Sequence, residues 1–423
     1  MLLVSQIIAE KSRFVAGLEK RGIKDAESML DEVLALDKKR KNTQQELDQN
    51  LAEANSISRQ IGALMKEGKR DEAEVVKTKT AELRSRNKEL AEIKESTQEA
   101  LKAALYNIPN IPHDSVPKGL TDEDNELVET VGDLPDLPES AVPHWDLIKK
   151  HDIIDFDLGI KITGAGFPVY KGKGARFQRA LVNFFLDQAA AAGYGEIQPP
   201  IVVNEASGYG TGQLPDKEGQ MYHITVEDLY LIPTAEVPIT NLYRDVIVQE
   251  DQLPVKHVGF TPCFRREAGS WGAHVRGLNR LHQFDKVEIV QVRKAEESYD
   301  ALTEMCEHVA GLLNKLELPY RILRLCSGDL GFTSVLTYDF EVYSGAQKKW
   351  LEVSSVSNFE TYQANRLKLR YKGADKKTQL LHTLNGSAMA LPRIMAAILE
   401  NNQDAEGIRM PDALVPYTGF DRI

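Results

Sequence analysis

The residues best suited to chemistry begin with the run Phe-Arg-Arg-Glu at 264–267. On a β-strand Arg265 and Glu267 would share one face, with Arg266 on the other. An arginine held by a sheet can bind a phosphate through two parallel hydrogen bonds. By itself, however, this run is more typical of a surface hairpin with an ordinary ladder of Arg and Glu side chains.

The next expected strand, His-Gln-Phe-Asp-Lys-Val-Glu at 282–288, favours a binding site. Phe284, Lys286 and Glu288 would lie on one face, and Phe284 and Glu288 would be about 13 Å apart along the strand. An aromatic platform for a base at one end and a carboxylate for an ammonium at the other suit an aminoacyl-adenylate. Phe284 as a plain core residue is the alternative, and Glu288 on the same face weakens it.

Two later stretches could complete such a site. Glu352 with the hydroxyls of Ser354 and Ser355 offers oxygen ligands for an Mg²⁺ that bridges phosphates. Strict alternation would put Glu352 and Ser355 on opposite faces, so a shared metal requires a bulge or a strand end. Arg393 is expected near the start of a helix, where a cation gains nothing from the helix dipole. We therefore expect it to bind a group outside the helix, such as the terminal phosphate of ATP.

Common sequence motifs for nucleotide and zinc binding are absent from the sequence. There is no GxxxxGK[ST] run, no GxGxxG between a strand and a helix, and no HExxH. The three cysteines (Cys263, Cys306 and Cys326) form no CxxC pair, which disfavours a disulfide framework or a cysteine zinc site and fits a reducing compartment. No apolar run approaches the roughly 18 residues of a membrane span. These features predict a cytoplasmic protein with no membrane segment.

The elements that must position these residues follow one another mostly as strands joined by turns. Strands are expected at 230–236, 256–267, 282–292, 320–328, 337–344 and 350–357, and helices at 175–194 and 386–403. Few helices separate the strands, which favours an antiparallel sheet flanked by helices over a doubly wound parallel sheet. The sequence therefore predicts an α+β fold for this region.

The N-terminal region differs in composition and in the spacing of its apolar residues. Residues 25–105 contain no proline and only two glycines, and are rich in helix formers. Apolar residues step by three and four, which predicts two helices in an antiparallel coiled-coil hairpin. The expected seam is Leu47, Leu51, Ala54, Ser58, Ile61 and Met65 on the first helix, and Val76, Thr80, Leu83, Asn87, Leu90, Lys94, Thr97, Leu101, Ala104 and Ile108 on the second.

Charge gives this arm a candidate role. Between Lys38 and Lys102 there are 15 Lys and Arg against 12 Asp and Glu, whereas the whole chain carries −11. The arm, with the cluster KKRK at 38–41, is therefore the part best suited to a phosphate backbone. A dimerisation or spacer element is the alternative. We predict three regions: the arm domain 1–108, an acidic linker 109–140 and a catalytic domain 141–423.

Taken together, these motifs resemble a known family. The runs FRRE…GLNRLHQFDKVE and LEVSSVSNFE…NGSAMALPRIMAAILEN resemble motifs 2 and 3 of class II aminoacyl-tRNA synthetases. The run GAGFPVYKGKGARFQRALVNFFLDQAAAAGYGEIQPP resembles motif 1. IPTAEVP and SSVSNFETYQANR are similar to the seryl-tRNA synthetase members of that class, and the likeness extends over the whole chain.

The resemblance implies an activity and partners. The family forms seryl-adenylate and pyrophosphate from ATP and L-serine with Mg²⁺, then transfers serine to the 3′ end of tRNA(Ser), and a role with tRNA(Sec) stays open. Its arm binds the long variable loop of the tRNA, the motif 2 loop meets the acceptor end, and the enzyme is a homodimer.

The resemblance also assigns residues, by their matching positions. The implied serine-binding residues are Thr234, Ala235, Glu236, Arg265, Glu288 and Ser387. The implied ATP-binding residues are Arg265, Arg266, Glu267, Phe284, Glu352, Val353, Ser354, Ser355 and Arg393. Arg265 and Arg393 would be catalytic, and Glu352 and Ser355 would hold the Mg²⁺.

The chain departs from the family pattern at three places. Val356 stands where Cys is frequent, Pro392 stands where Gly usually precedes the arginine, and Ala273 to Val275 replace charged residues at the tip of the motif 2 loop. The last departure bears on how the acceptor end of tRNA is bound.

Two other functions fit parts of the pattern. One is a ligase that loads an amino acid onto a carrier protein, which the long arm disfavours because such a partner has no variable loop. The other is a tRNA-binding relative that has lost catalysis. The presence of Arg265, Glu267, Glu288, Glu352 and Arg393 argues against that loss.

Overall fold

The computed structural model describes residues 1–268, 276–374 and 376–423. The chain divides into two compact units. The first comprises Met1–Glu19 with Ile23–Pro109, and the second comprises Lys20–Gly22 with Asn110–Ile423. Among the described residues, every helix falls short of the length and hydropathy that a bilayer span requires.

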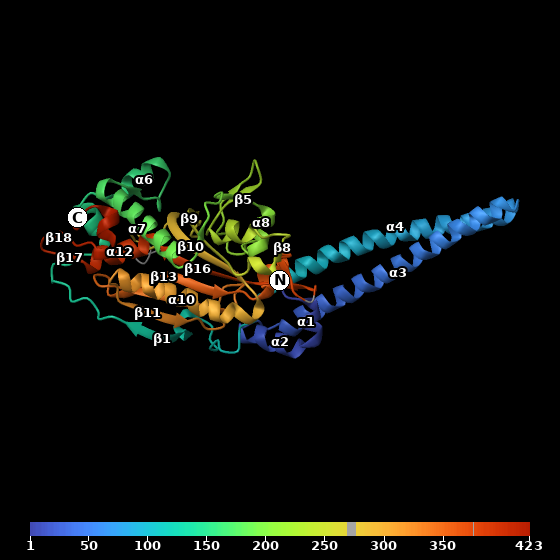
Figure 1. The fold of residues 1–423 in the computed structure, drawn as a ribbon, viewed down its shortest axis with the longest axis horizontal. Coiled ribbons are helices and arrows are strands. Elements are labelled where there is room, and N and C mark those ends of the chain that lie inside the picture. Colours follow the sequence, from blue (N-terminus) through green and yellow to red (C-terminus); the bar gives the residue numbers. More distant parts are fainter. Residues whose placement is uncertain (269–275, 375) are drawn as a thin grey trace. The chain divides into compact units, whose positions relative to one another are not determined.

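The first unit is helical. It contains α1 (Val4–Ala9), α2 (Lys11–Lys20), α3 (Ala26–Lys66) and α4 (Arg70–Tyr106). Helices α3 and α4 lie side by side along their length (Figure 1), and the turn between them contains Gly68 at φ +75°. This left-handed conformation suits glycine. The predicted helical hairpin is confirmed.

The seam between the two long helices is only partly as predicted. On α4 none of the expected seam residues from Val76 to Ala104 is exposed. On α3 three of the expected seam residues are exposed to solvent: Leu51, Ser58 and Met65. Their places are taken by the residues just before them, Asn50, Ile57 and Leu64. A seam that steps by four then three and a seam that steps by three then four have alternate positions in common. Packing against the partner helix decides which of the two seams forms.

The second unit is built on an eight-stranded sheet (Figure 1). Its strands, in spatial order, are β1 (Glu126–Val131), β11 (Tyr320–Arg324), β12 (Leu336–Ser344), β13 (Lys349–Asn358), β16 (His382–Ala390), β10 (Gln283–Arg293), β9 (Val255–Phe264) and β4 (Gly195–Glu196). Neighbours in the sheet pair antiparallel apart from β4 and β9. The predicted antiparallel sheet is confirmed.

Helices and short sheets surround this sheet. The helices are α5 (His144–Lys150), α6 (Phe156–Ile162), α7 (Gly172–Ala191), α8 (Glu205–Thr211), α9 (Glu236–Asn241), α10 (Ser298–Lys315), α11 (Thr361–Leu367), α12 (Leu391–Asn401) and α13 (Val415–Thr418). The short strands are β2 (Ile154–Asp155), β3 (Val169–Tyr170), β5 (Val202–Asn204), β6 (His223–Ile224), β7 (Leu229–Leu231), β8 (Ile247–Gln249), β14 (Arg370–Lys372), β15 (Thr378–Leu380), β17 (Gln403–Asp404) and β18 (Gly407–Ile408).

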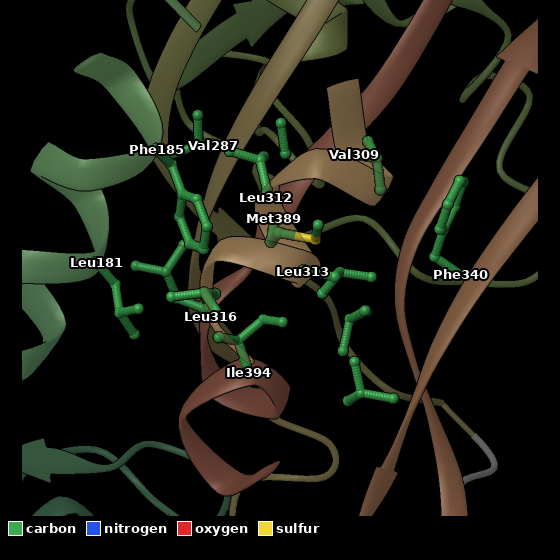
Figure 2. Close-up of a cluster of buried hydrophobic side chains, with 14 of the residues drawn as sticks. Leu181, Phe185, Val287, Val309, Leu312, Leu313, Leu316, Phe340, Met389 and Ile394 are labelled. Carbon is green, nitrogen blue, oxygen red and sulfur yellow. The ribbon is translucent and has the colours of Figure 1, made fainter. Parts of the chain in front are cut away.

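The core of the second unit lies between the sheet and helices α7, α10 and α12. Figure 2 shows Phe185 of α7, Leu313 of α10 and Ile394 of α12 packed with Val287 and Met389 of the sheet. All five side chains are fully buried, so the hydrophobic effect holds this side of the sheet against the helices. The opposite side of β10 carries Lys286 and Glu288 beside the buried apolar residues Val290 and Val292.

Several predicted boundaries need correction. The helix expected from residue 386 begins at Leu391, because Gly386 to Ala390 complete β16. This run of small residues has no clear period, and only pairing with β10 shows that it is a strand. The predicted linker 109–140 contains β1, which pairs with β11 at the edge of the main sheet.

Candidate active site

Strand β10 positions the centre of the site. Its residues alternate, so Val287 and Ile289 enter the hydrophobic core while Lys286 and Glu288 lie together on the other face. Lys286 Nζ is 2.5 Å from Glu288 Oε2, and both side chains are almost wholly buried. The prediction that these residues share a face is confirmed. A buried ion pair of this kind needs further hydrogen bonds to offset desolvation.

One such hydrogen bond comes from Asn385, which also joins Glu288 to a second buried carboxylate, Glu236. Asn385 Nδ2 on β16 donates to Glu288 Oε1 at 2.9 Å and to Glu236 Oε2 at 3.0 Å. Gln363 Nε2 on α11 donates to Glu236 Oε1 at 2.6 Å. One amide therefore bridges the two carboxylates, and strands β10 and β16 meet helices α9 and α11 at one point.

The surroundings of Glu236 shift the pKa of its carboxyl group. Burial raises the pKa of its carboxyl to about 7, helped by the negative charge of Glu288. The Gln363 hydrogen bond and the cations Lys286 and Arg265 act in the opposite direction. Two carboxyl groups that share a buried site attract an ammonium group, because a cation would relieve their mutual repulsion.

The other predicted serine-binding residues lie around this pair. Ser387 is opposite Glu288 in the sheet, and its hydroxyl is 3.4 Å from Glu288 Oε2. The Thr234 hydroxyl accepts a hydrogen bond from the main-chain N–H of Glu236 at 3.2 Å. Ala235 is fully buried. Thr234 and Ala235 follow β7 as a turn, not as the predicted continuation of the strand.

Arg265 and Phe284 are brought together across β9 and β10. The Arg265 guanidinium carbon lies 5.2 Å from the centre of the Phe284 ring, which is a cation–π distance. Strand β9 ends at Phe264, and Glu267 has φ +48°. The predicted strand alternation from Arg265 to Glu267 is therefore wrong, because the chain turns away from the sheet at this point.

The residues after Arg265 differ in exposure. Glu267 Oε2 accepts from Arg280 Nη1 at 3.1 Å, and the Glu267 side chain is only 14% exposed. Arg266 is exposed, and its main-chain N–H donates to the Gln220 carbonyl. The predicted loop tip at 273–275 lies outside the described residues.

The predicted metal-binding stretch contains the required bulge. Phe340 pairs with Ser354, and the next residue of β12, Glu341, pairs with Glu352. The register thus skips Val353, which is buried in the core. A bulge turns neighbouring side chains off strict alternation, and it lies between Glu352 and Ser355. Ser354 is buried, and its hydroxyl donates to the Ser387 carbonyl at 2.5 Å.

A third oxygen-bearing residue stands beside these two. Asp339 of β12 pairs with Ser355 across the strands, and its carboxyl hydrogen bonds the Ser355 side chain. Burial, together with the negative charge of Glu352, raises the pKa of Asp339 well above its usual value. Two carboxyl groups and a hydroxyl make a donor set that fits Mg²⁺, which takes its remaining ligands from phosphates and water.

Arg393 lies in the first turn of α12, as predicted. Its Nε donates to the main-chain carbonyl of Asn279 at 3.0 Å, and its Nη1 donates to that of Glu352 at 2.6 Å. The same Nη1 is 3.5 Å from Glu352 Oε2. Pro392 occupies the first turn of α12, where its missing N–H leaves no helical bond unmade. Val356, where the family frequently has Cys, is fully buried in the core.

Sequence reasoning missed three residues of this arrangement: Asp339, Gln363 and Asn385. Gln363 and Asn385 stand inside runs that carry the resemblance, ETYQANR and NGSAMALPR. An amide has no charge to mark it, however, and the contact of both amides with Glu236 depends on strand pairing. Asp339 would have been found by asking which residue faces Ser355 across a hairpin.

Comparison with known proteins identifies the family of this chain. The model of the seryl-tRNA synthetase N-terminal domain matches residues 1–112, and that of the tRNA synthetase class II core domain (G, H, P, S and T) matches residues 222–402. Curated serine–tRNA ligases from Salinibacter ruber and Akkermansia muciniphila are 48% and 46% identical. Each alignment covers 100% of this chain and 99% of the relative.

A solved structure gives the same result. The seryl-tRNA synthetase of Pyrococcus horikoshii, crystallised with ATP, is 32% identical with a TM-score of 0.93, over 100% of this chain and 99% of that one. These relatives support neither the carrier-protein ligase nor the inactive relative. Two family models match the chain, and its relatives are similar to it over their full length. The chain therefore belongs to the seryl-tRNA synthetase family of class II aminoacyl-tRNA synthetases.

Proposed function

We propose that the protein is a serine–tRNA ligase, which activates L-serine with ATP and transfers it to tRNA(Ser). One observation carries the proposal. Phe284 and Glu288 lie on β10, with Arg265 next to Phe284 and with Glu236 joined to Glu288 through Asn385. They do so in a chain that matches curated serine–tRNA ligases end to end.

The amino-acid end of the site is the carboxylate cluster. Glu288 and Glu236 would hold the serine ammonium, which would replace Lys286 as a partner of Glu288. Thr234, Ser387 and the Ala235 segment would surround the small side chain. A buried set of hydrogen-bonding groups favours a hydroxyl over a methyl group, since alanine would leave those groups unpaired. Alanine should be activated at least about a hundredfold less well than serine.

The nucleotide end is the arginine and aromatic cluster. Phe284 would stack on adenine, and Glu267 would accept from its amino group. Arg265 would bind the α-phosphate and the serine carboxylate, and Arg393 the γ-phosphate, with Arg266 nearby. Glu352 and Ser355 would hold Mg²⁺ against the phosphates, with Val353 and Ser354 supporting that strand.

The chemistry requires no nucleophile from the protein. The serine carboxylate attacks the α-phosphorus of ATP and pyrophosphate leaves; a ribose hydroxyl at the 3′ end of tRNA then attacks the seryl carbonyl and releases AMP. Mg²⁺ would supply charge stabilisation on the phosphates. The side chains position the two reactants and stabilise the negative charge that develops between them.

The arm is the proposed contact for tRNA. Within the cluster at 38–41, Arg40 and Lys41 are each paired with Asp37, at 2.8 and 2.7 Å, whereas Lys38 and Lys39 are exposed. Lys38 and Lys39 are therefore the better candidates for phosphate contacts. The motif 2 loop would meet the acceptor end.

We also propose a cytoplasmic homodimer. In the described chain β4 is the outermost strand of the main sheet, and a cavity of about 390 Å³ beside it is lined by α7 residues such as Gln178 and Arg179. A strand at the edge of a sheet, next to a hollow, is a surface that a second copy could cover. Light scattering on the purified protein would show a mass near 47 kDa if the protein were instead a monomer.

Pyrophosphate exchange tests the function directly. Purified protein with Mg²⁺-ATP and labelled pyrophosphate should form labelled ATP with serine and not with the other nineteen amino acids. Charging of a tRNA(Ser) transcript should follow. Exchange with a different amino acid would overturn the substrate, and exchange with none would overturn the ligase function.

A further inference from the structure

A buried polar network connects three segments that lie beside the site. His144 opens helix α5, and Glu400 lies in the last turn of α12. Both side chains are fully buried, with His144 Nδ1 2.7 Å from Glu400 Oε1. The third segment, residues 276–280, is the part of the chain that returns from the motif 2 loop to β10.

The imidazole contacts that returning segment directly. His144 Nε2 accepts a hydrogen bond from the main-chain N–H of Leu278 at 2.8 Å. An Nε2 that accepts carries no hydrogen, so Nδ1 is the donor to Glu400 and the tautomer is set by both partners. Gly277 has φ +67°, and a Cβ there would lie 2.3 Å from His144 Nε2. Only glycine lets the segment come so close to the ring.

A second path reaches the same segment through Gln347. Its Nε2 donates to Glu400 Oε1 at 2.8 Å, and its Oε1 accepts from Asn279 Nδ2 at 3.0 Å. The two consecutive residues Leu278 and Asn279 are therefore held by one buried carboxylate, through two different side chains.

Both carboxylate oxygens of Glu400 accept hydrogen bonds. Its Oε1 also accepts from the main-chain N–H of His144 at 2.9 Å, and its Oε2 accepts from the Ser344 hydroxyl. Burial alone would raise the pKa of Glu400, but the hydrogen bonds from His144 and Ser344 hold it below its usual value. Glu400 is therefore a fixed anion on which the other groups are oriented.

The segment held in this way carries partners of two proposed ATP-binding residues. The main-chain carbonyl of Asn279 accepts from Arg393 Nε at 3.0 Å, and Arg280 is paired with Glu267 at 3.1 Å. A shift of residues 278–280 would move both Arg393 and Glu267. The serine-binding carboxylates lie on β10 and α9 and have other partners.

We infer that His144 is a positioning residue for ATP: through its Nε2 it holds residues 278–280 and thereby sets Arg393 and Glu267 for the nucleotide. This inference rests on the proposed function. A purely structural role would predict lost stability with no preference between the two substrates, whereas positioning predicts a selective loss toward ATP.

Two substitutions of His144 test the roles of its two ring nitrogens separately. In His144→Asn the amide nitrogen can replace Nδ1 as donor to Glu400, and nothing replaces Nε2. In His144→Gln the amide oxygen can replace Nε2 as acceptor for Leu278. Leaving a buried N–H unpaired in His144→Asn should raise the KM for ATP in pyrophosphate exchange about tenfold. The KM for serine should stay within about twofold, and His144→Gln should recover most of the ATP effect.

The controls make each failure distinguishable. His151→Asn, at the end of the same helix, should change neither KM. Equal rises in both KM values, or an unchanged KM for ATP in a folded His144→Asn protein, would overturn the inference. If His144→Asn does not fold, Gln347→Met removes the second anchor of Asn279 and should give the same selective loss. A wild-type protein without serine-dependent exchange would instead overturn the proposed function.

A double-mutant cycle tests the route through Arg393. ATP binding is measured by calorimetry for wild type, His144→Asn, Arg393→Lys and the double variant. The effects should be less than additive, because both substitutions disturb one contact. Full additivity would show that His144 does not act through Arg393.

Discussion

The helical arm and the catalytic sheet are held together in different ways. In the arm the interacting residues repeat along two helices joined by a three-residue turn between Lys66 and Arg70. In the sheet, one buried cluster draws Glu236, Glu288, Gln363 and Asn385 from positions up to 149 residues apart. Periodicity thus describes the arm well, while the site exists only after distant strands have paired.

The two regions should also fail differently when altered. A change in the site should abolish activation of serine while leaving the arm's contribution intact. A change in the arm should spare activation and affect tRNA. The following experiments test this separation, beginning with the largest expected effect.

Arg265→Ala should lower kcat/KM for pyrophosphate exchange by about a thousandfold, because it removes the cation proposed to bind the α-phosphate of ATP. Circular dichroism should show an unchanged fold. Arg265→Lys keeps the charge but loses the planar, two-pronged geometry, so exchange should be intermediate. Wild-type exchange in the alanine variant would refute the assignment of Arg265.

Replacing residues 26–106 with a short Gly-Ser linker should lower kcat/KM for charging of tRNA(Ser) by about a hundredfold or more. Exchange should stay within about twofold of wild type, since the site lies in the other unit. The double variant Lys38→Ala, Lys39→Ala should show a smaller loss of kcat/KM for charging. The slope of log kcat/KM against log salt concentration should become shallower by about two. Unchanged charging after the deletion would show that the arm does not bind tRNA.

The seam of the arm can be tested by two alanine substitutions on one helix. Ile57 is 5% exposed and Leu51 is 45% exposed. Ile57→Ala should lower the free energy of unfolding of the arm by about 2 kcal/mol, because it leaves a cavity between the helices. Leu51→Ala should cost less than about 0.5 kcal/mol. Thermal unfolding followed by helical ellipticity measures both, and the reverse ranking would restore the seam expected from the sequence.

The smallest expected effect is a pH dependence confined to the site. Burial next to Glu288 raises the pKa of Glu236 to about 7, so acid removes a charge that would bind the serine ammonium. Between pH 8 and pH 6, kcat/KM for serine should fall about tenfold. Glu236→Gln should lower the plateau and flatten this profile, and a profile identical to wild type would contradict the role of Glu236.

The same shift predicts a change in stability of the opposite sign. A carboxyl whose pKa is about 4.5 when unfolded and about 7 when folded stabilises the fold fully below pH 4.5, and this contribution is lost as pH rises through 7. Without serine, the melting temperature of the catalytic unit should therefore be lower at pH 8 than at pH 6. This difference should be smaller in Glu236→Gln.

Some site features could be predicted because they depend on neighbours in sequence. Phe284, Lys286 and Glu288 share a face because alternation along a strand is local. A bulge or a strand end between Glu352 and Ser355 was expected if both residues served one ion, and the structure has a bulge at Val353. The seam of α3 was misplaced by one residue at three positions because two heptad patterns fit its apolar residues almost equally well.

Other features required the tertiary structure. Arg265 and Glu267 could not be placed from alternation, since the chain leaves the sheet after Phe264 and Glu267 adopts a left-handed conformation. Ser387 was expected on a helix and lies on a strand, because pairing with β10 outweighs the helix-forming tendency of the small residues around it.

The sequence by itself determined the two kinds of architecture, the arm's helices and the charged residues that a nucleotide and an amino acid would require. These follow from local periodicity and from side-chain chemistry. Only the tertiary structure decided which neutral residues complete the site, such as Asn385 between two carboxylates and His144 behind the returning segment. Hydrogen bonds between distant segments depend on register and burial, and neither is encoded in the spacing of any one stretch.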